Sequence, residues 1–161
     1  MAPPVAVASE IIINAPANAV MAAAAGFDIP DIIRAHGPLP GVARVDGHEG
    51  PWSAAGQQRR LTLTDGSTAT ETLVDIHPRG FEYKIEFGAP FSAVARSGGG
   101  RFCVADEGAQ SLLNWRYHFE PASILTAPVV VVVAKLVWPG YMRAALARLK
   151  DSIEKTSIET T

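Results

Sequence analysis

The segment LNWRYHF at residues 113–119 decides the fold class, because apolar and polar side chains alternate along it without a break. Side chains along a β-strand point alternately to its two faces, so a period of two places all the apolar ones together. Such a strand has one buried and one solvated face, which is typical of antiparallel sheets. The apolar face would carry Leu113, Trp115, Tyr117 and Phe119.

A second segment, FEYKIEF at residues 81–87, repeats the pattern, with Tyr83 and Ile85 on its apolar face. Short turn signals rich in Gly, Asp and Pro separate further strand-like segments, which favours hairpins over crossovers. The glycines of residues 97–100 (SGGG) are interpreted as a flexible hairpin tip. The predicted strands are residues 5–13, 42–46, 57–63, 69–76, 81–87, about 93–105 and 110–120.

Helical patterns occupy the rest of the chain. Residues 17–25 and 31–35 predict two short helices after the first strand, and the tail from residue 121 to about 154 predicts a long one. Pro139 and Gly140 should kink this helix or divide it. The run at 124–138 is interrupted by Pro128 and Lys135 and is interpreted as a buried helix without a membrane span. The apolar stripe is predicted to carry Leu136, Met142, Leu146, Leu149 and Ile153.

Composition narrows the function classes. The 161 residues suit one domain, 1–161, and the net charge of −2 without a basic run argues against nucleic acid as a partner. One cysteine and four scattered histidines provide no converging metal ligands, so neither a metal nor a cofactor is expected. The first residues do not resemble a signal peptide, which favours a cytoplasmic location. A homodimer is left open.

The most informative polar residue is Glu71, and the turn at Asp65–Gly66 decides its partner. A three-residue loop, 64–66, would pair Arg59 with Glu71 on the inner face of the sheet. A two-residue loop would pair Arg60 with Glu71 on the outer face, since a slip of one residue turns every side chain over. The next turn, 77–80, predicts Tyr83 on the face opposite Glu71.

Several stretches resemble the START-like superfamily, also called SRPBCC or Bet v 1-like, and within it bacterial polyketide cyclase/dehydrase-type proteins. They follow the order of that fold, although a tryptophan common in the first helices of relatives is absent. The stretches are residues 9–20 (SEIIINAPANAV), 40–46 (PGVARVD), 60–73 (RLTLTDGSTATETL), 75–85 (DIHPRGFEYKI) and 115–121 (WRYHFEP).

The resemblance implies an α+β helix-grip fold, a seven-stranded curved antiparallel sheet around a long C-terminal helix. It implies a cavity between the two for lipids, polyketides, hormones or aromatic compounds, and it leaves catalysis undecided. Leu61, Leu63, Glu71, Tyr83, Ile85, Trp115, Tyr117 and Met142 are the predicted ligand-binding residues.

Three functions follow as hypotheses. The first is binding of a small hydrophobic or aromatic, polyketide-like molecule. The second is a polyketide cyclase or dehydratase, in which Arg59 stabilises an enolate and Glu71 or Tyr83 moves a proton. No catalytic motif supports it directly. The third is a protein- or membrane-interaction module, if the segment 128–138 exposes its apolar side chains.

Overall fold

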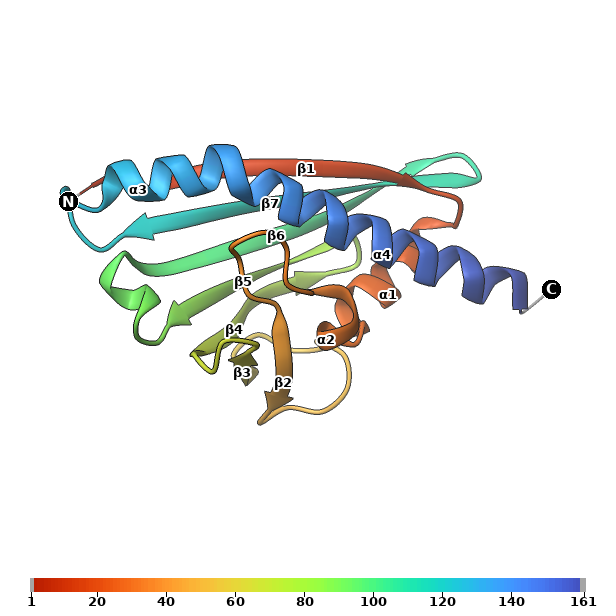
Figure 1. The fold of residues 1–161 in the computed structure, drawn as a ribbon. Helices are drawn as coiled ribbons and strands as arrows, with labels where there is room; N and C mark the ends of the chain where they lie inside the picture. Colours follow the sequence, from red (N-terminus) through yellow and green to blue (C-terminus); the bar gives the residue numbers. More distant parts are fainter. Residues whose placement is uncertain (1, 160–161) are drawn as a thin grey trace.

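The computed structural model describes residues 2–159, which form one seven-stranded antiparallel sheet and a long C-terminal helix lying across it (Figure 1). The strand order is β1-β7-β6-β5-β4-β3-β2, so the first and second strands form the two edges. The strands are β1 (Val5–Ile13), β2 (Val42–Asp46), β3 (Gln58–Leu63), β4 (Thr68–His77), β5 (Gly80–Phe87), β6 (Ala95–Glu107) and β7 (Gln110–Pro121).

Two short helices, α1 (Ala17–Gly26) and α2 (Ile29–Ile32), join the two edge strands. They pack against one end of the long helix, as Figure 1 shows. The predicted α+β helix-grip architecture is therefore confirmed, including the two short helices after the first strand. The second of them begins and ends a little earlier than predicted.

Strand β7 has the alternation that the sequence predicts. Its apolar residues are buried, from Leu113 at 0% exposure to Phe119 at 6%, while Arg116 is exposed. Burial of these side chains stabilises the fold, at roughly 25 cal/mol for each Å² of apolar surface removed from water.

The glycine-rich stretch is not a hairpin tip, and that prediction is wrong. Gly98, Gly99 and Gly100 lie within β6, paired with β5 on one side and β7 on the other. A Cβ atom on Gly100 would lie 2.2 Å from the hydroxyl of Tyr83, and one on Gly98 would lie 3.1 Å from that of Tyr117. Gly98 and Gly100 are needed because these two tyrosine side chains lie directly over the strand.

The C-terminal helix is continuous but irregular. It consists of α3 (Ala127–Val132), a π-helical turn η2 (Val133–Val137) and α4 (Trp138–Glu159). The predicted interruption at Pro139 takes the form of this π turn, in which Trp138 N–H donates to the carbonyl of Val133. π turns inside α-helices accommodate one extra residue. The helix therefore accommodates Pro139 and does not divide into two separate helices.

The apolar run before Pro139 is not buried as predicted. Leu125 and Leu136 are 90% and 79% exposed, and Val129, Val131 and Val132 are also exposed. Leu136 precedes Met142 by six residues, a spacing that falls between helical turns and places it beside the buried stripe. Only Val130 and Ala134 of this segment are fully buried.

By length and composition alone, the helix Ala127–Glu159 could cross a membrane, since an 18-residue window has a mean hydropathy of 1.5. One third of that window is buried inside the molecule. The second half of the same helix packs into the protein core through Leu146, Leu149 and Ile153, as the core helix of a globular domain does. The composition is therefore weak evidence for a span.

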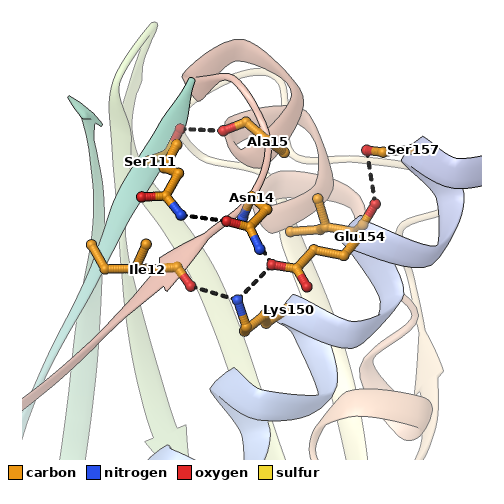
Figure 2. A network of polar contacts seen from close by, with 9 residues as sticks. Ile12, Asn14, Ala15, Ser111, Lys150, Glu154 and Ser157 are labelled. Carbon is orange, nitrogen blue, oxygen red and sulfur yellow. Dashed lines mark hydrogen bonds and ion pairs between the residues drawn. The ribbon is translucent and has the colours of Figure 1, made fainter. Parts of the chain in front are cut away.

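A polar network fastens the second half of α4 to the end of β1 (Figure 2). Lys150 donates to the carbonyl of Ile12 at 2.8 Å and to Glu154 at 2.5 Å. Glu154 also accepts from the backbone N–H of Asn14 at 2.8 Å. The helix is thus fixed at this end, while its N-terminal half extends along the sheet towards the apolar cavity described next.

Candidate functional site

The β3–β4 hairpin has the three-residue loop. Leu63 N–H donates to the carbonyl of Ser67, and Gly66 adopts a left-handed φ of 89°. This register pairs Arg59 with Glu71. Both side chains point inward, with side-chain exposures of 10% and 7%, and Arg59 Nε donates to Glu71 Oε2. Of the two predicted alternatives, the structure therefore has the Arg59–Glu71 pair on the inner face of the sheet.

Tyr83 lies on the same face as Glu71, so the prediction that separated them is wrong. The β4–β5 pairing follows the predicted register from His77 to Asp75, where Val74 forms a β-bulge. Beyond the bulge, Leu73 pairs with Tyr83 and Glu71 pairs with Ile85. One extra residue turns the rest of β4 over relative to β5. Val74 itself is half exposed.

A cavity of about 370 Å³ lies between the inner face of the sheet and the N-terminal half of the long helix. Its wall is almost entirely apolar, and among residues 2–159 Arg59 and Glu71 are the only charged residues in it. Seven of the eight predicted ligand-binding residues line it. They are Leu61, Leu63, Glu71, Tyr83, Ile85, Trp115 and Tyr117.

Met142 is the predicted residue that the structure places elsewhere. It is fully buried in the protein core and does not line the cavity. The cavity reaches the helix only as far as Tyr141. Beyond that point the helix packs directly into the core through Ala145 and Leu146, so no space remains beside Met142.

The sequence reasoning missed the helical and loop sides of the cavity. Trp138 and Tyr141 close it from the helix, and they stack on each other with ring centroids 4.7 Å apart. Their spacing of three residues is the signal that could have identified them. Leu39 and Pro40 line it from the loop before β2, where the hydroxyl of Tyr141 donates to the carbonyl of Pro40 at 3.0 Å. This bond fastens the loop to the helix.

The guanidinium of Arg59 is held from behind by Trp52. It lies 3.9 Å from the centre of the Trp52 ring, a cation–π contact, and the imidazole of His48 stacks on the same indole. Trp52 is 3% exposed, and its backbone N–H donates to the carbonyl of Ala25. The loop between β2 and β3 therefore fixes the orientation of the ion pair from outside the cavity.

Burial raises the pKa of the Glu71 carboxyl above its usual value, and the charge and hydrogen bond of Arg59 oppose this effect. Burial likewise raises the pKa of the Tyr83 phenol, and the nearby Tyr117 and Glu71 raise it further. The pKa of Tyr117 is raised by burial and by the charge of Glu71. Both phenols therefore stay protonated across the pH range in which the protein would work.

The hydroxyl groups of Tyr83 and Tyr117 differ in their hydrogen bonding. The Tyr83 hydroxyl accepts a hydrogen bond from Trp115 Nε1 at 2.9 Å, which orients its phenol. Within residues 2–159, the hydroxyl of Tyr117 and the second carboxylate oxygen of Glu71 have no hydrogen-bond partner. Residues 2–159 contain no group of three or more His, Cys, Asp or Glu side chains that could hold a metal ion.

A curved antiparallel sheet that holds a long helix over an apolar cavity defines a helix-grip protein. The chain belongs to the family described as polyketide cyclase/dehydrase and lipid transport, whose model matches residues 4–154. This confirms the resemblance seen in the sequence. A comparison with curated proteins gives no significant match.

Solved structures have the same fold. Norcoclaurine synthase from Thalictrum flavum, a point mutant with a transition-state analogue, has a TM-score of 0.71 at 11% identity over 96% of this chain and 97% of that one. The Zhui aromatase/cyclase from Streptomyces sp. R1128 has a TM-score of 0.66 at 18% identity over 95% of each chain. An uncharacterised protein from Bacillus thuringiensis has 0.63 at 23% identity, over 92% and 98%. At these identities the likeness shows the fold alone.

Proposed function

We propose that the chain binds a small hydrophobic or aromatic, polyketide-like molecule in the cavity between the sheet and the C-terminal helix. The observation that carries this proposal is the apolar cavity of about 370 Å³. Pockets for small molecules are typically 300–1,000 Å³, apolar, and equipped with a few polar groups. An apolar ligand would gain free energy by leaving water, at roughly 25 cal/mol for each Å² buried.

Filling the cavity should weaken this binding. Ala69 lines the cavity on β4, whereas its neighbour Thr70 points to the opposite face. We expect Ala69→Phe to weaken binding of the fluorescent probe N-phenyl-1-naphthylamine at least ~10-fold, since the new ring would occupy the ligand's space. Thr70→Phe, the matched control, should bind like the wild type. Circular dichroism confirms that each variant is folded, and failure of the wild type to bind the probe would refute the proposal.

Catalysis on such a ligand is the alternative that the same residues support. The inward Glu71 is the observation in its favour, because an outward carboxylate could not have served as a base. Arg59 would stabilise an enolate, and Glu71 or Tyr83 would move the proton. Native mass spectrometry of the purified protein and extraction of its ligand separate the two functions. A binder returns an added candidate ligand unchanged, whereas an enzyme returns a product.

An interaction surface is the third candidate, favoured by the exposed apolar segment at the start of the helix. Between residues 122 and 138 the only charged side chain is Lys135, and Val129 and Val133 also line the cavity. Exposed apolar patches of this kind mark interaction sites. We propose a lipid surface as the partner, since a ligand could then pass between it and the cavity. A cytoplasmic location and a homodimer are further proposals.

Vesicle flotation tests this surface. We expect the wild type to float with phosphatidylcholine vesicles and Leu125→Ser/Leu136→Ser to lose at least ~10-fold in binding, because two exposed leucines are removed, each worth about 1.5–3 kcal/mol when buried. Ile158→Ser is the matched control, since Ile158 is equally exposed at the far end of the same helix. Equal loss in the control, or no flotation of the wild type, would count against a lipid-facing role.

A further inference from the structure

The polar end of the cavity carries a defined set of unused hydrogen-bonding groups. Glu71 is 5% exposed and lines the cavity, yet only one of its carboxylate oxygens accepts a hydrogen bond, from Arg59. The Tyr117 hydroxyl, also on the wall, has no partner among residues 2–159. The two groups offer one acceptor and one donor that a ligand can use.

These atoms are not sealed inside the protein. Among the described residues, the buried side-chain nitrogen and oxygen atoms that lack both a partner and any access are the indole nitrogens of Trp52 and Trp138. The free oxygen of Glu71 and the hydroxyl of Tyr117 each keep some accessible surface, and both residues line the cavity. A buried polar group left without a partner costs about 1–3 kcal/mol, so a ligand that satisfies both groups gains affinity.

Charge narrows the ligand class further. Arg59 and Glu71 neutralise each other, and the described part of the chain contributes no other charged residue to the wall. An ionic head group would lose its hydration without a net opposite charge to replace it, and that loss amounts to several kcal/mol. A ketone or an ether can accept from Tyr117 but cannot donate to Glu71. A hydroxyl group does both.

We propose that the cavity selects neutral hydroxylated hydrophobic molecules, alcohols or phenols, whose hydroxyl donates to the free oxygen of Glu71 and accepts from the hydroxyl of Tyr117. This inference rests on the proposed binding function and names its ligand class. The phenol of Tyr83, oriented by Trp115, forms the neighbouring part of the wall.

Three matched probes at pH 7 test the proposal by displacing N-phenyl-1-naphthylamine. 2-Naphthol has the donor and the acceptor, 2-methoxynaphthalene keeps only the acceptor, and 2-naphthoate is charged. We expect 2-naphthol to bind at least ~10-fold more tightly than either, because a hydrogen bond to a charged group contributes about 1.5–3 kcal/mol. Equal affinity of 2-naphthol and 2-methoxynaphthalene, or tighter binding of 2-naphthoate, would overturn the proposal.

Glu71→Gln identifies the group responsible. Arg59 still requires an acceptor, so the amide oxygen of the new residue would face Arg59 and its NH2 group would face the ligand. We expect the preference for 2-naphthol over 2-methoxynaphthalene to disappear in this variant. Tyr117→Phe should weaken both compounds alike, since both accept from the lost hydroxyl. Glu86→Gln, on the exposed outer face, is the control that should keep the wild-type preference.

The experiment distinguishes failure of this proposal from failure of the proposed binding function. If N-phenyl-1-naphthylamine fails to bind the wild type, the binding function itself fails. If that probe binds but Glu71→Gln retains the full preference for 2-naphthol, the binding function stands and the assignment of the hydroxyl to Glu71 is overturned.

Discussion

Replacing Arg59 by Met should lower the free energy of unfolding by about 3–5 kcal/mol at pH 8. The substitution removes one partner of a buried ion pair and leaves the carboxylate of Glu71 uncompensated in an apolar cavity. It also removes the cation that lies over the ring of Trp52. Urea unfolding at fixed temperature measures the loss directly.

The loss should depend on pH in a defined direction. Burial raises the folded-state pKa of Glu71, and without Arg59 nothing opposes that effect. Above the ordinary pKa of a glutamate, the unfolded chain releases this proton while the folded variant retains it. The folded state then binds more protons, so its stability falls as pH rises. The variant should therefore differ less from the wild type at pH 4.5 than at pH 8.

Arg60→Met provides the control, because Arg60 is the next residue on β3 and is exposed. We expect it to change the stability by no more than about 0.5 kcal/mol at either pH, as surface substitutions usually do. If Arg59→Met lowered the free energy of unfolding equally at both pH values, the loss would come from packing. The charge on Glu71 would then not be its cause.

The sequence predicts the sheet and its helix well, because both depend on local periodicity. The alternation at residues 113–119 and the turn residues between strands are local signals, and burial then selects the face. For the same reason the sequence could predict the Arg59–Glu71 pair as one of two alternatives. Only the length of one loop was undecided, and the Asp65–Gly66 sequence is compatible with both alternatives.

The rest depends on features without a local signal. The bulge at Val74 decides whether Tyr83 and Glu71 share a face. A single β-branched residue in a regular strand is no sequence signal for a bulge. A row of three glycines is typical of a turn. Here the glycines lie within a strand, and two of them, Gly98 and Gly100, leave space for tyrosine rings from the neighbouring strands, which is a tertiary constraint. The exposure of Val129, Val131 and Val132 also depends on how the helix lies against the sheet, which is a tertiary feature.

The second large effect is expected at Gly100. Adding a methyl group there should destabilise the protein by about 1–3 kcal/mol, because its Cβ would lie 2.2 Å from the hydroxyl and 2.4 Å from the Cζ atom of Tyr83. Neither distance is tolerated, and β6 is held by strands on both sides. The ring of Tyr83 would therefore have to move into the cavity. We expect Gly100→Ala to weaken binding of N-phenyl-1-naphthylamine at least ~10-fold as well.

A double-mutant cycle with Tyr83→Leu tests this explanation. Removing the ring should be less costly in the Gly100→Ala background than in the wild type, since the methyl group then has room. The double variant should also bind the probe more tightly than Gly100→Ala alone, because the displaced ring no longer fills the cavity. Stabilities that add within about 0.5 kcal/mol would contradict a direct clash between the two side chains. Interaction beyond that limit would mean that Gly100 maintains the cavity by leaving space for Tyr83 against the sheet.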